Sequence, residues 1–178
     1  AWAADNEIVL GQRKVDEKSN EITAIPELLK ILSIAGCIVT IDAMGTQTNI
    51  AKTIVDAQAD YVLSVKENQG RLFEDIVTIF AVDQASDFKY AAYEEKKTTN
   101  KGHGRIDIRE CWSTSNPAYL CLIRGVQNWI GLQSIAMVKC TRILNGKETT
   151  SVRYYISSLP SDAERILHAV RKHWSIEN

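Results

Sequence analysis

The chain has 178 residues, of which 45% are hydrophobic and 24% charged, a composition typical of an ordinary globular domain with a sizeable core. No apolar run reaches the ~18–20 residues of a membrane span and no secretory leader is visible, so we expect a cytoplasmic protein with no membrane partner. The net charge is −1, but residues 96–153 carry ten Lys/Arg against three Asp/Glu, whereas residues 1–95 carry eight against sixteen. That segregation hints at a polyanion contact on the basic block, although solvated lysines on a β-rich surface would give the same count.

The first part of the chain predicts alternating helices and strands after an opening hairpin. Residues 1–4 and 7–15 flank the polar turn Asp5-Asn6, so a β-hairpin is already in progress where the sequence opens. Apolar spacing then predicts helices over residues 25–32 (beginning near Pro26), 49–58 and 69–80, and strands over residues 37–41 and 61–65. Because strand, helix, strand implies a crossover, we expect the two strands to be parallel neighbours.

The pattern changes from about residue 90 to residue 158, where apolar and polar residues alternate as in antiparallel strands. Asn145-Gly146 is a strong hairpin signal within this segment. Ser161 and Glu164 then form a capping box, which predicts a helix starting near residue 161. This helix meets no stop signal before Asn178, so we expect a fragment truncated at both ends.

Asp42 directly follows the apolar run 37–41, which places its carboxylate at the carboxyl end of a predicted parallel strand. Ligands bind at that edge in open α/β sheets. A helix-cap or turn aspartate is about equally common after a strand, and position alone leaves both interpretations open. Lys66 follows the strand at 61–65 and is expected on the same edge, where an ordinary helix-start loop is the alternative.

Glu177 lies on the predicted packing face of the last helix. Trp174, Val170, Leu167 and Ile166 precede it by 3, 7, 10 and 11 residues and form one apolar stripe at 3.6 residues per turn. An ionised carboxylate on a packing face costs several kcal/mol unless it is paired or binds a metal. Glu177 is therefore a candidate metal ligand, with a basic partner or a protruding helix end as the alternatives.

Together Asp42 and Glu177 would bind a hard divalent cation such as Mg²⁺ through oxygen ligands. A two-metal centre, with ions roughly 3.5–4 Å apart, usually needs a third acid. No other acid stands at an obvious strand end facing the same edge, so the third is expected before residue 1. The histidines and cysteines lack metal-ligand spacing, and no serine sits in a Gly-x-Ser-x-Gly turn, so zinc chemistry and a Ser/His/Asp triad are unsupported.

Cations gather in and beside the loop 100–105, where Lys101, His103 and Arg105 alternate with glycines. Flexible glycines beside cations suit the approach of the backbone to phosphates, and phosphate contacts supply most sequence-independent DNA affinity. A solvated hairpin tip is the alternative interpretation of this loop.

Several strings in the sequence match one known family and span nearly the whole chain. Two of them, DEKSNEI at residues 16–22 and TIDAMG at residues 40–45, are specific. The others are Gly11-Gln12, residues 24–26 (AIP), residues 60–62 (DYV), Lys66 with Asn68-Gln69, residues 103–105 (HGR), residues 153–158 (RYYISS), and Arg171 with His173-Trp174 and residues 176–178 (IEN). Through these strings the chain closely resembles the H-repeat-associated branch of insertion-sequence transposases.

The resemblance implies a DDE-type enzyme on an RNase H-like fold, in which a mixed α/β sheet is flanked by helices and a β-rich insertion precedes the last helix. It implies an Asp, Asp and Glu set around two Mg²⁺ ions, for which Mn²⁺ can substitute. Asp42 matches the second acid and Glu177 the third, while the first would precede this chain. Residues 1–89 would form the core without its first strand, residues 90–158 the insertion or sheet extension, and residues 159–178 the truncated last helix.

The implied activity is cleavage of DNA at transposon ends and transfer of the strand to target DNA, with a homo-oligomer as the active form. Related transposases carry a Tyr, an Arg and a later Lys around the glutamate; here Arg171 and His173 precede it. The DNA-binding candidates are Lys66, Asn68, Lys101, His103, Arg105, Arg171 and His173. The alternatives are a nuclease that cuts without joining and a degenerate, non-catalytic DNA-binding protein, and the fragment alone is expected to be inactive.

Overall fold

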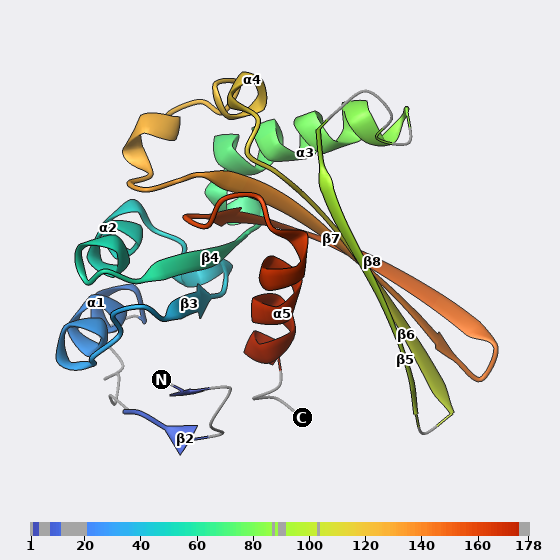
Figure 1. Cartoon of the computed structure of the whole chain (residues 1–178), viewed down its shortest axis with the longest axis horizontal. Helices are drawn as coiled ribbons and strands as arrows, with labels where there is room; N and C mark the ends of the chain where they lie inside the picture. Colours follow the sequence, from blue (N-terminus) through green and yellow to red (C-terminus); the bar gives the residue numbers. More distant parts are fainter. Residues whose placement is uncertain are drawn as a thin grey trace.

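The computed structural model describes residues 2–3, 8–11, 21–86, 88, 92–102 and 104–174. In chain order the elements are β1 (Trp2–Ala3), β2 (Ile8–Val9), α1 (Glu21–Ile31), β3 (Ile38–Ile41), the 3₁₀ turn η1 (Ala43–Gly45), α2 (Thr48–Asp56), β4 (Asp60–Val65), η2 (Glu67–Gln69), α3 (Arg71–Gln84), β5 (Glu94–Gly102), β6 (Arg105–Thr114), α4 (Pro117–Leu120), η3 (Val126–Asn128), β7 (Ser134–Leu144), β8 (Lys147–Ser157) and α5 (Ala163–His173). β1 pairs with β2 as the opening hairpin, and β3 to β8 form a six-stranded sheet flanked by helices (Figure 1). The predicted fold class, a mixed sheet with helices on an RNase H-like plan, is confirmed.

The strand order of the large sheet is β3-β4-β8-β7-β6-β5. β3 and β4 are parallel and joined by α2, as the strand-helix-strand pattern predicts, whereas every other pair is antiparallel. β8 joins the two parts because its last residues pair with β4. The β-rich segment before the last helix is therefore an extension of one continuous sheet, and the division into 1–89, 90–158 and 159–178 stays a prediction.

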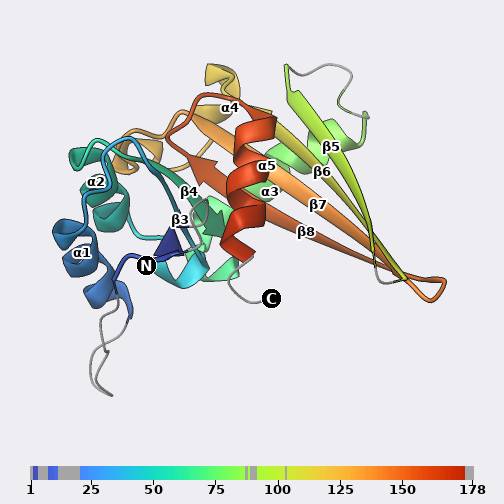
Figure 2. The ribbon, with the colours of Figure 1, turned by 60° about the horizontal axis from the view of Figure 1, so that its bottom comes forward.

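The sheet has a hydrophobic core on each face. On one face α1, α2 and α3 pack against alternate strand residues, and the fully buried side chains there include Ile54, Phe80, Leu63, Met137 and Ile156. α5 lies on the other face of the sheet (Figure 2). It packs there through Ile166, Leu167 and Val170 against Val62, Cys111, Val138 and Tyr155. The predicted apolar stripe of the last helix is thus confirmed for these three residues, while Trp174 is half-buried beside them.

Two helix starts differ from the predictions. α1 begins at Glu21, so Pro26 lies inside the helix and not at its start. In that second turn the missing N–H of Pro26 deprives only the Ile22 carbonyl of a helical partner. α5 is capped by Asp162, whose carboxylate accepts from the Arg165 N–H at 2.9 Å, and not by Ser161, whose own N–H donates to Ser115 Oγ at 2.6 Å.

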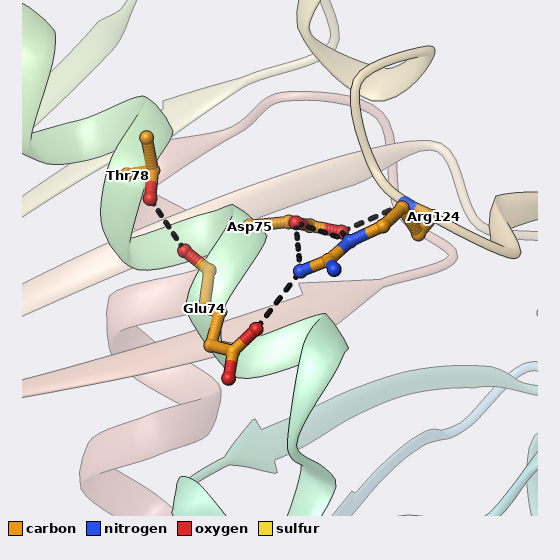
Figure 3. A network of polar contacts seen from close by, with 4 residues as sticks. All are labelled: Glu74, Asp75, Thr78 and Arg124. Atoms are coloured by element: carbon orange, nitrogen blue, oxygen red, sulfur yellow. Dashed lines mark hydrogen bonds and ion pairs between the residues drawn. The ribbon is translucent and has the colours of Figure 1, made fainter.

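Turn chemistry and one ion-pair network fix the connections. Asn145 and Gly146 both adopt positive φ, 51° and 75°, and join β7 to β8 as predicted. The long β6–β7 connection is tied to α3 by Arg124, whose guanidinium contacts Asp75 at 2.8 Å and Glu74 at 2.9 Å (Figure 3). Among the described residues, no helix combines the length and apolar character needed to cross a membrane.

The Arg124 network predicts a pH-dependent contribution to stability. The hydrogen bond from Arg124 lowers the pKa of Asp75. Because the folded pKa is depressed, the contribution is present above the unfolded carboxyl pKa of ~4 and is lost as pH falls through the folded value. Arg124→Met should therefore lower the free energy of unfolding at neutral pH, and urea denaturation should show the difference from the parent shrinking as pH drops below ~4.

Lys52→Met is the control, since the Lys52–Asp56 ion pair is well exposed on both sides and surface pairs of this kind contribute little. Its effect should be small throughout the pH series. A deficit of Arg124→Met that is the same at every pH would contradict the account.

Candidate active site

Asp42 lies at the point where β3 ends and has extended backbone angles that make it the cap of η1. Its Oδ1 accepts hydrogen bonds from the backbone N–H groups of Met44, at 3.2 Å, and Gly45, at 3.4 Å. The residue is exposed, and no described residue donates to its other oxygen, Oδ2. Oδ1 therefore orients this exposed side chain at the carboxyl end of a parallel strand, while Oδ2 receives no hydrogen bond from the described residues. The cap role and the edge position, which the sequence left as alternatives, coexist.

The loop after Asp42 is fastened to the neighbouring strand by a buried hydroxyl. Thr46 is fully buried, and its Oγ1 contacts two carbonyl oxygens, that of Asp42 at 3.1 Å and that of Ser64 at 2.6 Å. Because Ser64 lies near the end of β4, this one side chain holds the ends of β3 and β4 together. Thr46 therefore ties the backbone of Asp42, at the end of β3, to the backbone of Ser64 in β4.

The turn after β4 completes the edge. The side-chain amides of Asn68 and Gln69 both donate to the carbonyl oxygen of Ala43, at 2.9 and 3.0 Å. Lys66, the exposed residue at the N-cap position of η2, lies two residues before Asn68. Lys66 and Asn68 thus lie on the same edge as Asp42, as the parallel pairing predicts. The amide nitrogen of Asn68 serves to hold this loop, and the DNA-binding roles of Asn68 and Lys66 stay predictions.

Gly45 allows the Asp42 turn to pack closely on its neighbours. A Cβ at this position would lie 2.4 Å from Ile41 Cγ2 and 2.8 Å from Ile25 Cδ1, shorter than real contacts of this kind. α1 and the end of β3 therefore leave room only for a glycine. This contact sets the depth at which η1, and with it Asp42, lies on the sheet.

The end of α5 reaches the same strand. The imidazole Nδ1 of His173 lies 3.1 Å from Thr40 Oγ1, two residues before Asp42. α5 starts beside β5, where Glu164 pairs with Lys96 at 2.7 Å, and crosses the sheet to end near the carboxyl end of β3. Glu177 lies outside the described residues. Within the described part of the chain, no group of three or more His, Cys, Asp or Glu side chains is placed to hold a metal.

Lys101 and Arg105 of the basic block lie on the β5–β6 hairpin. The strand register places Lys101 and Arg105 on opposite faces of the β5–β6 hairpin, and Arg105 pairs with Asp107 at 3.0 Å. His103 lies outside the described residues. Arg171 is exposed on α5 and lines a groove of about 720 Å³ between that helix and the sheet. The DNA-binding roles of these four residues stay predictions.

The sequence analysis did not single out two residues that the structure shows in polar contacts: Thr46 beside Asp42, and Arg142, which pairs with Asp107 at 2.9 Å. Thr46 gave no signal, because a threonine after Gly45 in a loop predicts nothing about a bond to Ser64, eighteen residues along the chain. Arg142 was also missed, although the spacing Arg105-x-Asp107-x-Arg109 already indicated a single charged face on one strand.

The chain matches a family model described as the transposase DDE domain over residues 1–178. It is 39% identical over its whole length to "Putative transposase YncI" of Escherichia coli O157:H7, of which it covers 45%. It is 38% identical over its whole length to "H repeat-associated putative transposase YhhI" of Escherichia coli K12, of which it covers 47%. A protein of Xanthobacter autotrophicus, "Uncharacterized protein in dhlA 3'region", is 37% identical over 91% of the chain. The chain spans about half the length of these curated relatives.

The close packing at Gly45 predicts that Gly45→Ala destabilises the protein by about 1–3 kcal/mol, the usual cost of forcing a methyl group into a filled site. Thermal unfolding followed by circular dichroism measures this. Gly102→Ala is the matched control, because a Cβ there meets nothing within 4 Å and its φ is not in the left-handed region. Equal unfolding temperatures for the two variants would contradict the packing argument.

Proposed function

Because the chain belongs to the transposase DDE-domain family, we propose that it supplies part of the metal-dependent active site of a DNA transposase. The observation that supports this most directly is Asp42, an exposed carboxylate held by its own turn at the carboxyl edge of the β3–β4 pair. The enzyme would cut DNA at the transposon ends and join the freed strand to target DNA. A homo-oligomer would hold the two ends.

The donor chemistry of Asp42 suits a hard divalent cation. Mg²⁺ and Mn²⁺ prefer oxygen ligands and bind through one or two carboxylates together with water and substrate phosphates. Oδ1 of Asp42 is occupied by two backbone N–H groups, which fix the carboxylate plane, and Oδ2 receives no hydrogen bond from the described residues. This arrangement leaves one oriented oxygen for a cation.

Glu177 is proposed as a second ligand. It follows His173 by four residues in the sequence. The bond between His173 and Thr40 supports this assignment, because it brings the end of α5 to the strand that carries Asp42. The first acid of the family pattern would come from a part of the transposase outside this sequence.

The reaction we propose has two displacement steps at phosphorus. In the first, a water oxygen forms a P–O bond and the P–O bond to the transposon end breaks, which leaves a free 3′-hydroxyl. In the second, that hydroxyl attacks a target phosphodiester, and the target strand leaves with its own 3′-hydroxyl. Divalent cations bound at the acids would activate the attacking oxygen and stabilise the leaving one.

The residues of the chain itself would orient and neutralise the substrate. Asp42 fixes the edge at which the scissile phosphate must lie. Lys66 stands exposed on the same edge and can offer a positive charge to the phosphate that flanks it. The hydrogen bonds of Asn68 and Gln69 to Ala43 keep the two turns together while the substrate is bound.

Asp42→Asn in a protein of the relatives' length that carries this sequence should abolish Mg²⁺-dependent cleavage of a transposon-end duplex, and Glu177→Gln should do the same. Loss of a metal ligand removes several kcal/mol of transition-state stabilisation, a fall of about 10³-fold or more. Gel assays of nicked and joined products measure both steps, and DNA binding in EDTA should be retained.

Asp56→Asn is the control, because Asp56 is an exposed aspartate on α2 whose ion pair among the described residues is with its own helix neighbour Lys52. It should cleave and join as the parent does. Cleavage by the Asp42→Asn variant at the parent's rate would refute the proposed role, and nicked ends without joined products in the parent would favour a nuclease.

A further inference from the structure

The outer parts of β5 to β8 form an arm that projects past the helices (Figures 1 and 2). The strand register sorts the charges of the arm by face. We define the arm as residues 95–102, 105–110, 139–144 and 147–153. In a strand, alternate side chains point to opposite faces, and the cross-strand register extends that alternation over the whole arm. The face that continues the α5 side of the sheet is the α5 face, and the other is the α3 face.

The two faces have very different charge. The α5 face carries six cations and one carboxylate: Lys96, Arg105, Arg109, Arg142, Lys147, Arg153 and Asp107. The α3 face carries three cations and three carboxylates: Lys97, Lys101, Lys139, Glu95, Glu110 and Glu148. Apart from the contacts of Asp107, each face has, among the described residues, one cation in an ion pair of 2.7 Å: Lys96 pairs with Glu164 of α5, and Lys97 pairs with Glu110. The positive charge of the basic block is therefore concentrated on the side of the sheet where α5 lies.

Asp107 organises three of the arginines. Its side chain is only 10% exposed, and it contacts Arg142 at 2.9 Å, Arg105 at 3.0 Å and Arg109 at 3.6 Å. Burial raises the pKa of Asp107, but the hydrogen bond from Arg142 and the charges of the arginines outweigh burial, so its pKa lies below the ordinary value. One ionised carboxylate thus holds three guanidinium groups in a fixed array that keeps a net positive charge.

Near α5 the array continues into a groove of about 720 Å³. Arg109, Arg142, Arg153 and Arg171 line it together with Trp174. Arg153 lies over the Trp174 ring, with its guanidinium carbon 4.4 Å from the ring centre. This cation–π contact links β8 to the end of α5 along the groove. The hydroxyl groups of Thr149 and Ser151 also line the groove.

The arm begins at the edge that carries Asp42. Tyr154 of β8 pairs with Val65, the last residue of β4, so residues 147–153 extend beyond the end of β4 where Lys66 follows. β3 is parallel to β4 and ends at the same edge. At ~3.4 Å per residue these seven residues reach about 24 Å from that edge. The α5 face therefore leads directly away from the candidate active site.

We propose that the α5 face of the arm is a binding surface for the backbone of duplex DNA, and that Arg109, Arg142 and Arg153 are its central phosphate contacts. The inference rests on the proposed function and deepens it, because it assigns the DNA path on one side of the sheet. A substrate bound here passes the groove beside α5 and arrives at Asp42.

Charge and shape favour this occupant. The cations are spread along about 20 Å, more than half of the ~34 Å turn of B-DNA, and do not converge on one point as a small-anion site requires. Arginine forks and hydroxyl groups are the usual donors to phosphate oxygens, and such contacts read no sequence. Binding should therefore be independent of DNA sequence and steeply dependent on salt.

The test compares two triple variants that each remove three positive charges. The α5-face variant is Arg109→Gln, Arg142→Gln and Arg153→Gln, and the α3-face variant is Lys97→Gln, Lys101→Gln and Lys139→Gln. Fluorescence anisotropy with a labelled duplex of arbitrary sequence, in EDTA and over a salt series, measures affinity and its salt slope. The α5-face variant should bind at least about tenfold more weakly at ~0.1 M salt, with a slope shallower by about 2–3. The α3-face variant should match the parent.

A third variant with lysine at positions 109, 142 and 153 keeps the charge, controls for folding and should retain most of the salt slope. The inference would be overturned if the two glutamine variants lost DNA affinity equally, or if neither lost any. It would also be overturned if the parent bound A-form RNA or polyglutamate better than duplex DNA. Because EDTA removes divalent cations, the binding assay measures DNA affinity without any contribution from metal ions at the candidate active site. Lost binding in the α5-face variant, together with normal cleavage by Asp42→Asn, would sink the proposed function and leave the DNA surface standing.

Discussion

The antiparallel pairing of β4 with β8 is the contact on which the rest of the structure depends. β4 is covered on both faces, and its residues from Tyr61 to Val65 are at most 6% exposed. On one side it holds β3 in parallel register and on the other it receives β8. The hydroxyl of Ser157 adds a bond to the Tyr61 carbonyl at 2.8 Å. Because this one strand belongs to both parts of the sheet, the Asp42 edge and the charged arm keep a fixed relation.

As a consequence, the α5 side of the sheet has two parts: one is covered by apolar side chains and the other carries charged side chains. Near β4 that side is covered by apolar residues of α5, such as Ile166 and Val170, and needs no charge. Beyond β4 no described helix covers it, and arginines held by Asp107 replace the apolar residues. The strand alternation that buries Val138 in the core therefore also presents Arg142 on the arm.

The sequence predicts most elements of the fold, because apolar periodicity and the Asn145-Gly146 turn are local signals. It places Asp42 on the correct edge for the same reason. The helix starts were less predictable: the hydroxyl of Ser161, which would have capped α5, contacts Ser113 Oγ from a distant segment at 2.9 Å, and Asp162 caps the helix instead. The two faces of the arm could not be separated by counting charges along the chain, since Lys101 and Arg105 are near in sequence and point apart because of strand register.

The most direct test of the account is a titration of the chain with Mn²⁺ followed by paramagnetic broadening of backbone amide resonances. A cation on Asp42 should broaden the amides of Met44, Gly45 and Lys66 first, since these surround its carboxylate and the adjoining turn. The Asp42→Asn variant should lose that local effect. Broadening centred elsewhere, for instance on Asp75, or an effect at Gly45 that survives the substitution, would contradict a metal site at this edge.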